Sequence, residues 1–310
     1  MMWRVALAVW LTAALSLFAF NAPRAQFNGC QAGFCSPPSS AAAAYVGPGD
    51  ITSGAIAFYS CSRAYNAAYA SGLNAACDVV DTATGLVTGT MHFLSTGFVN
   101  VNELTGVGQA CHAACSVTKM YDQTGTGNHV VQATLANMPA LTFNAQNGLP
   151  CAAGGANSPR LVTAGNITQA APFTMTAVTE RGSGFTTLQN IQNNGNLNIL
   201  RFPAVANQVS AVSGTASTLT ATDSAFHALL AVVSATAPLF AADSSANTST
   251  ATFGTSAMAS TEAIVGRSGG QGPILAGGFV CEAGIWPADL NSSYQAMLAN
   301  MRSATNGWNF

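Results

Sequence analysis

The chain has 310 residues and a formal net charge of −2, and only 6% of its residues are charged. Ordinary soluble proteins carry roughly 25% charged residues, so this surface must consist mainly of Ser, Thr, Asn, Gln and Gly. Nucleic acid is excluded as a partner, because its backbone demands clustered Lys and Arg and Lys119 is the single lysine. The composition suits neutral ligands such as sugars, and the small net charge favours self-association.

The first 25 residues have the organisation of a cleavable signal peptide. Arg4 precedes an apolar run from Val5 to Phe20, and Ala25 ends a short segment with small residues. The run is shorter than the about 20 apolar residues that a membrane span needs. We therefore predict that the mature chain begins at Gln26, contains no transmembrane segment, and is secreted, periplasmic or located at the cell surface. The alternative is an uncleaved N-terminal anchor.

Eight cysteines follow the predicted signal peptide. They are Cys30, Cys35, Cys61, Cys77, Cys111, Cys115, Cys151 and Cys281. An even number in an exported chain favours disulfides over free thiols. The alternative is a metal site, but the sequence lacks the doubled Cys-x-x-Cys pattern that is typical of one. We therefore predict disulfides, with no metal and no cofactor.

The predicted elements begin with a linker over residues 26–45, which is rich in Gly, Ser, Pro and Ala and has no apolar period. The folded domain is predicted over residues 46–310, a length that one large sandwich fills. Tyr59–Tyr69 lacks β-branched residues and predicts a short helix packed on the sheet. Phe173–Thr179 alternates as a half-buried strand does, whereas Phe226–Val233 is more continuous and predicts a deeper strand.

Clusters of Asn and Gly separate the predicted strands, at Asn193–Asn196 and at Ser268–Gly272. Several short strands divided by such turns predict an all-β sandwich or jelly roll. Residues 290–301 form an amphipathic segment that predicts a helix, with Asn291 or Ser292 as its N-cap. The fold class is therefore all-β with one or two short peripheral helices.

A glycine-rich turn follows a predicted strand at residues 117–129. Positive φ angles are expected at its glycines, and its Asp and Asn side chains can bond the backbone of the turn. Residues 121–129 read Tyr-Asp-Gln-Thr-Gly-Thr-Gly-Asn-His and resemble Tyr-Asp-Gln-Ser-Gly-x-Gly-Asn-His in the catalytic domain of α-L-arabinofuranosidase B, glycoside hydrolase family 54. The turn therefore supplies candidate ligand contacts, which are Tyr121, Asp122, Gln123, Asn128 and His129.

Other segments resemble the same family in the same order. Gly47–Ile51 looks like its Gly-Pro-Cys-Asp-Ile opening, and Ser62–Tyr65 looks like its Thr-Arg-Ala-Leu-Tyr helix. Gly277–Pro287 looks like the last strand of the wider superfamily. The resemblance covers residues 47–180 well and the remainder loosely. It implies a concanavalin-like or laminin-G-like β-sandwich.

The same resemblance bears on the cysteine pairing. Cys111 and Cys115 lie where the family has a small disulfide loop, just before the turn, and only three residues separate them. We expect this pair first. Sequence alone does not fix connectivity, but the remaining expected pairs are Cys30–Cys35, Cys61–Cys77 and Cys151–Cys281.

The resemblance implies retaining hydrolysis by two carboxylates about 5–5.5 Å apart. The family's nucleophile is a Glu that follows a vicinal cysteine pair, but this chain has no such pair and no carboxylate between Glu180 and Asp223. The family's acid/base is an Asp in a Gly-Gly-Asp-Asn loop, where this chain has Gln271, a further candidate ligand contact. Glu180 and Glu282 remain catalytic candidates, because burial beside apolar strands raises a carboxyl pKa. Their alternative reading is structural.

Three functions therefore stay open, because a fold alone does not decide function. The first is an exported protein that binds an arabinose-containing or other neutral polysaccharide and lacks the catalytic dyad. The second is an active arabinofuranosidase-type glycoside hydrolase that uses unrecognised acids. The third is a structural or adhesive scaffold of a cell or virion-like surface.

Overall fold

The computed structural model describes residues 44–154, 159–182, 189–195, 198–251, 253–265 and 277–310. Within these ranges the chain is built mainly from antiparallel strands, so the predicted all-β class is confirmed. The strands are β1 (Ala57–Ser60), β2 (Ala75–Asp81), β3 (Thr88–His92), β4 (Cys115–Met120), β5 (Val130–Val131), β6 (Ala140–Gln146), β7 (Leu149–Ala153), β8 (Leu161–Gln169), β9 (Phe173–Glu180), β10 (Gln189–Asn194), β11 (Asn198–Phe202), β12 (Gln208–Ser213), β13 (Thr215–Thr220), β14 (Phe226–Val233), β15 (Leu239–Ala242), β16 (Thr248–Ser249), β17 (Met258–Ile264) and β18 (Phe279–Trp286). The helices are α1 (Pro48–Ile51) and α2 (Tyr294–Arg302), with 3-10 turns at Val101–Glu103 and Leu135–Asn137.

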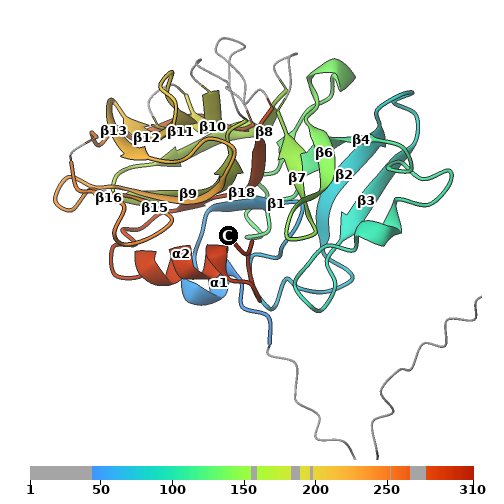
Figure 1. Ribbon diagram of the computed structural model, residues 1–310, viewed down its shortest axis with the longest axis horizontal. Coiled ribbons are helices and arrows are strands. Elements are labelled where there is room, and N and C mark those ends of the chain that lie inside the picture. The colour runs from blue at the N-terminus through green and yellow to red at the C-terminus, as the bar shows by residue number, and fades with distance from the viewer. Residues whose placement is uncertain (1–43, 155–158, 183–188, 196–197, 252, 266–276) are drawn as a thin grey trace, which may run out of the picture. The chain divides into compact units, whose positions relative to one another are not determined.

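Two layers of strands enclose the main hydrophobic core. In one layer β15, β14, β9, β18 and β1 pair in that order, and in the other β8, β17, β10, β11, β12 and β13 pair in that order. Figure 1 shows β10 to β13 above β9 and β18, with both helices below. Buried side chains such as Met175, Ile191, Leu229 and Ile285 belong to the core between the layers. This is the expected sandwich.

A second core lies on the other face of the β14–β9–β18 layer. Met297 and Met301 of α2 pack there in one cluster with Val178 of β9 and Leu230 of β14. β9 is therefore buried on both faces, and the prediction of a half-buried strand there is wrong. Its alternating threonines are buried because α2 covers the face that the pattern assigned to solvent. The deeper strand predicted at Phe226–Val233 is confirmed as β14.

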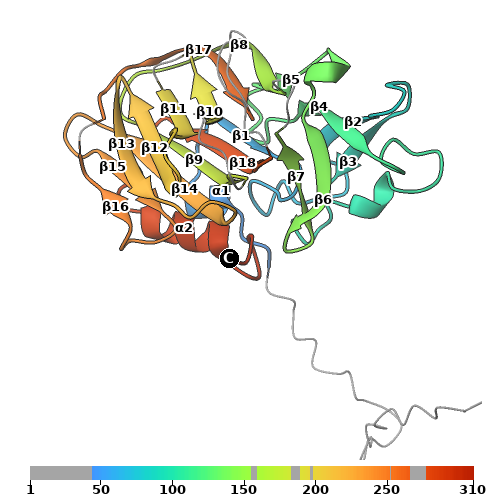
Figure 2. The same ribbon diagram turned by 45° about the horizontal axis from the view of Figure 1, so that its top comes forward.

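A smaller group of strands continues the sheet beside these layers. β2 lies between β3 and β4, and β4 pairs with both β5 and β6. β5 joins this group to β8, and β7, which pairs with β6, joins it to β18. Figure 2 shows β2 to β4 on the side of the sandwich away from β11 to β13.

The helix predicted at Tyr59–Tyr69 is wrong. Ala57–Ser60 is strand β1, which pairs with β18, and turns and bends occupy most of the stretch that follows. Tertiary contacts decide this local structure, since the Tyr59 ring is fully buried in the core and Ser60 Oγ accepts hydrogen bonds from the backbone N–H groups of Ser62 and Arg63. Alanine and tyrosine content alone is a weak prior that such contacts override.

The C-terminal helix is confirmed, but its predicted N-cap is wrong. Ser293 precedes the first helical residue, Tyr294. Asn291 instead donates its side-chain amide to the carbonyl of Ala237, and its backbone N–H bonds Asp289. The chain between β18 and α2 is thus fixed by contacts with a distant loop.

Three of the four expected disulfides are confirmed. They join Cys61 to Cys77, Cys111 to Cys115, and Cys151 to Cys281, with Cα atoms 5.3, 4.7 and 4.4 Å apart. Cys30 and Cys35 lie outside the described residues, as do the predicted signal peptide and nearly all of the predicted linker. Their assignments stay predictions. Residues from Ala43 to Phe310 form one compact unit.

Candidate functional site

The turn after β4 is built around the carboxylate of Asp122. Its Oδ1 accepts hydrogen bonds from the backbone N–H groups of Phe58 and Thr124, at 3.2 and 3.1 Å, and from the Thr124 hydroxyl. Its Oδ2 accepts from the Thr126 hydroxyl and the Asn128 N–H, at 2.6 and 3.1 Å. Asp122 is 3% exposed, so it fastens the turn to β1 rather than facing a ligand.

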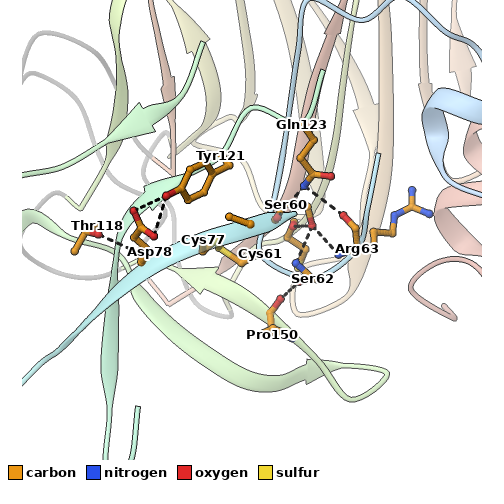
Figure 3. The surroundings of a disulfide bond; sticks show 12 residues. Ser60, Cys61, Ser62, Arg63, Cys77, Asp78, Thr118, Tyr121, Gln123 and Pro150 are labelled. Atoms are coloured by element: carbon orange, nitrogen blue, oxygen red, sulfur yellow. Dashed lines mark hydrogen bonds between the residues drawn. A yellow bond between two sulfur atoms is a disulfide. The ribbon is translucent and has the colours of Figure 1, made fainter. Parts of the chain in front are cut away.

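Gln123 and His129 are also held within the protein. Gln123 donates its side-chain amide to the carbonyl of Ser60 at 3.0 Å (Figure 3). Its side-chain oxygen accepts from the Tyr65 N–H at 2.6 Å. His129 Nδ1 accepts the Asp122 N–H at 3.0 Å, and burial lowers the pKa of His129. The neutral imidazole that can accept this bond is therefore favoured. Most polar atoms of the turn thus serve its own conformation.

Tyr121 differs from its neighbours because it lines an open cavity. Its hydroxyl donates to Asp78 at 3.0 Å, as Figure 3 shows, and burial followed by this hydrogen bond raises the pKa of Tyr121 to about 12. The cavity is about 300 Å³ and is lined by Asp78, Thr88, Thr90, Thr118 and Tyr121, together with two further residues of β2 and β3. We call it the Asp78 groove.

Glu282 is one half of a fully buried ion pair. Its Oε1 accepts from Arg63 Nη2 at 2.9 Å, and its Oε2 accepts from Arg63 Nε and from the indole N–H of Trp308. Arg63 also donates to the side-chain oxygen of Asn300 in α2 at 2.9 Å. Arg63 and Glu282 are 0% and 1% exposed. A carboxylate held in this way joins β18 to the C-terminal segment.

Glu180 lies at the end of β9, on the same face as Glu282. It pairs with Phe226 of β14 and Phe279 of β18, whose rings stack 6.0 Å apart. Burial raises the pKa of the half-buried Glu180, and the nearby His227 opposes this shift. The register places Glu282 opposite Val178, two residues before Glu180. The structure thus brings the two candidate acids to one face, but Glu282 is already engaged.

Sequence reasoning did not single out Glu262 of β17. It is fully buried, and its side chain shares a face with Ile264, so it faces the core between the two layers. Burial raises the pKa of Glu262 to about 8, and the amide groups of Gln192 and Asn194 offset part of that shift. Among the residues that the structure describes, neither carboxylate oxygen has a hydrogen-bond partner. Such a group is an unusual interior acid.

Glu262 lies in a polar row that crosses three strands. Asn194 of β10 is directly opposite Glu262, and Asn198 of β11 is directly opposite Asn194. Side-chain atoms of Gln192 and Asn198 are also buried without hydrogen-bond partners. The signal in the sequence was the concentration of amides at residues 189–194, which we interpreted in part as a turn. Asn193 and Asn194 instead belong to β10, and Gly195 follows them as the turn.

Gln271 lies outside the described residues, so its role as a candidate ligand contact stays a prediction. In the part of the chain that the structure describes, no group of three or more His, Cys, Asp or Glu residues could hold a metal ion. None of the helices described is long and apolar enough to cross a membrane.

Comparison with solved structures identifies the fold. An α-L-arabinofuranosidase of glycoside hydrolase family 54, soaked with a cyclic sulfate inhibitor, superposes with a TM-score of 0.60 at 15% identity, over 84% of this chain and 66% of its own. An arabinofuranosidase complexed with arabinofuranosyl-α-1,2-xylobiose gives 0.58 and 16%, over 84% and 65%. No family model and no curated protein matches the sequence. The fold is therefore like that of family 54, while these matches span less than two thirds of the solved chains.

Proposed function

We propose that the protein is an exported, glycan-binding β-sandwich that does not hydrolyse its ligand. The ligand class is a neutral polysaccharide, with arabinose-containing polymers as the first to test. The family-54-like fold and the scarcity of charge support this class. Three disulfides support an oxidising compartment outside the cytoplasm.

The observation that carries the proposal is the environment of the carboxylates. All 11 acidic residues of the chain lie within the described residues. All but Glu180 and Glu262 accept hydrogen bonds within the protein. A carboxylate that acts on a sugar must instead face the scissile bond. Asp78 lines an open cavity despite its bonds, but no other residue of that lining is a carboxylate that could complete a pair. Glu180 and Glu262 therefore remain to be considered.

Glu180 and Glu262 do not form a catalytic pair. Glu180 lies on the face of β9 that α2 covers, whereas Glu262 faces the core on the opposite side of that layer. Glycosidase carboxyls must lie about 5–9.5 Å apart with the sugar between them. A layer of strands between the two acids prevents this, so we expect no hydrolysis.

Activity and binding are measured on the same preparation. We expect 4-nitrophenyl α-L-arabinofuranoside to be cleaved no faster than in buffer, and arabinan or arabinoxylan to retard the protein in affinity electrophoresis. Robust turnover that disappears in Glu180→Gln or Glu282→Gln would overturn the proposal. Absence of both turnover and retardation would also reject it.

A second function, hydrolysis, would need a protonated acid at the sugar; burial raises the pKa of Glu262 to about 8, but its side chain is fully buried in the core. A carboxyl that stays protonated at neutral pH can act as a general acid. The same assay decides this, because Glu262→Gln would then abolish turnover. We favour binding because no second carboxylate faces Glu262 in the register of the strands that flank it.

A further inference from the structure

The Asp78 groove lies on a rigid support. Asp78 lies on β2, the middle one of three neighbouring strands. Thr90 of β3 and Lys119 of β4 are directly opposite it. The residue before it, Cys77, is fully buried and bonded to Cys61. Figure 3 shows this disulfide beside the Asp78 carboxylate, with the Ser60–Arg63 segment held by Gln123 on its other side. The groove is therefore preorganised, which reduces the entropy lost on binding.

The Asp78 carboxylate has a fixed orientation and unused acceptor capacity. Oδ1 accepts from the hydroxyls of Thr90 and Tyr121, at 2.6 and 3.2 Å, and Oδ2 accepts from Tyr121 at 3.0 Å. A carboxylate accepts about four hydrogen bonds, so capacity remains for a ligand. The Thr90 and Tyr121 oxygens, having donated their protons to Asp78, can themselves accept from ligand hydroxyls. This arrangement is complementary to groups that both donate and accept.

One residue of each charge belongs to the strands of the groove. Asp78 lines it, and Lys119 is directly opposite Asp78 in the register, with its ammonium group 3.9 Å from the centroid of the Tyr121 ring. A strong preference for an anion or a cation is therefore not expected. The remaining polar lining consists of the hydroxyls of Thr88 and Thr118. The volume of about 300 Å³ is at the lower end of ligand pockets, which suits a small ring rather than a long chain.

We propose that the Asp78 groove binds one ring of a neutral saccharide, whose hydroxyls donate to Asp78 and exchange hydrogen bonds with Thr90, Thr118 and Tyr121. This inference rests on the proposed glycan-binding function and assigns its site. The groove is separate from the polar row of Glu262, because Asp78 points away from the core to which its neighbours Cys77 and Val79 belong.

Affinity electrophoresis in gels that contain arabinan or arabinoxylan tests the site. Asp78→Asn removes the charge and changes the acceptor pattern with little change in shape, and Thr88→Trp fills the groove from an exposed position. We expect each to weaken binding about 10-fold or more, Asp78→Asn because it removes the charged acceptor and Thr88→Trp because its ring occupies the volume that the ligand needs. Thr88→Trp keeps the test valid if Asp78→Asn disturbs the strand.

Matched controls come from the same hairpin. Asp81→Asn changes an exposed carboxylate at the end of β2, which bonds Thr84 in its own turn, and Leu86→Trp places the same Trp side chain outside the groove. Both should bind as the unaltered protein does. Unchanged binding in Asp78→Asn and Thr88→Trp would reject the groove while leaving glycan binding intact. Failure of the unaltered protein to bind either polymer would reject the proposed function and the site with it.

Discussion

Glu262 has an ordinary pKa of 4.5 in an unfolded chain and a pKa raised to about 8 by burial in the folded protein. Between these values the folded state retains a proton that the unfolded state has lost. Stability therefore falls as the pH rises from about 4.5 to about 8. A fully buried acid without a charge partner makes the protein sensitive to alkaline conditions.

Glu262→Gln should remove this dependence, because glutamine does not ionise. One pKa unit corresponds to about 1.4 kcal/mol, so we expect the free energy of unfolding at pH 8 to rise by on the order of 4–5 kcal/mol. Urea unfolding between pH 5 and pH 9 measures it. Glu103→Gln, at a half-exposed acid that contacts His92, is the control. Identical pH profiles for Glu262→Gln and the unaltered protein would show that Glu262 is not the cause.

At the residue scale, the sequence predicts those features that depend only on neighbouring residues, such as the backbone conformation of a turn. The turn glycines Gly125 and Gly127 have φ angles of +85° and +81°, as expected from the motif. Glu262 could not be found in the same way, because its burial arises from the pairing of β17 with β8 and β10, which are distant in the sequence. A carboxylate in a strand of mixed small and polar residues gives no local sign that its side chain will face the core.

At the scale of elements, the buried pair of Arg63 and Glu282 joins three parts of the chain. These are β18, the helix α2, and the segment that follows β1. Glu282→Gln leaves the Arg63 guanidinium buried without its counter-charge, so we expect the free energy of unfolding to fall by about 3–5 kcal/mol. Replacing both residues together, Arg63→Met with Glu282→Leu, should cost less than the sum of the two single changes. Chemical denaturation of Arg63→Met, of Glu282→Leu and of the double variant measures this coupling.

The half-exposed pair of His92 and Glu103 provides the comparison. Glu103→Gln should change stability by less than about 1 kcal/mol, since exposed pairs contribute little. If Glu282→Gln were equally mild, Glu282 would not have the structural role that its contacts indicate. Its status as a catalytic candidate would then be open again.

Strands were easier to predict than the segments between them. The apolar run of β14 is long enough to identify, and the amphipathic pattern of α2 survives in the structure. The helix prediction for Tyr59–Tyr69 is wrong because tertiary contacts determine this segment. The Tyr59 side chain packs in the core, and Arg63 forms an ion pair with Glu282. The predicted N-cap of α2 is wrong for a similar reason, because the Asn291 side chain donates a hydrogen bond to a distant loop.

At the scale of the whole molecule, the disulfides close loops of very different length. Cys151 and Cys281 are 130 residues apart and join β7 to β18, whereas Cys111 and Cys115 are four apart. The chain-entropy model assigns the long loop about 5 kcal/mol and the short one about 2 kcal/mol. We therefore expect Cys151→Ala with Cys281→Ala to lower the melting temperature more than Cys111→Ala with Cys115→Ala. Calorimetry of the two double variants measures the difference, and the reverse order would contradict it.

The position of β18 in the layer has a consequence for the order in which the protein is made. β18 pairs with β1, β7 and β9, yet it follows all the other strands in the described chain. Because a ribosome adds residues from the N-terminus, β1 and β9 must wait for their shared neighbour with unpaired edges, which are prone to aggregate. The layer can close only when synthesis has passed Trp286.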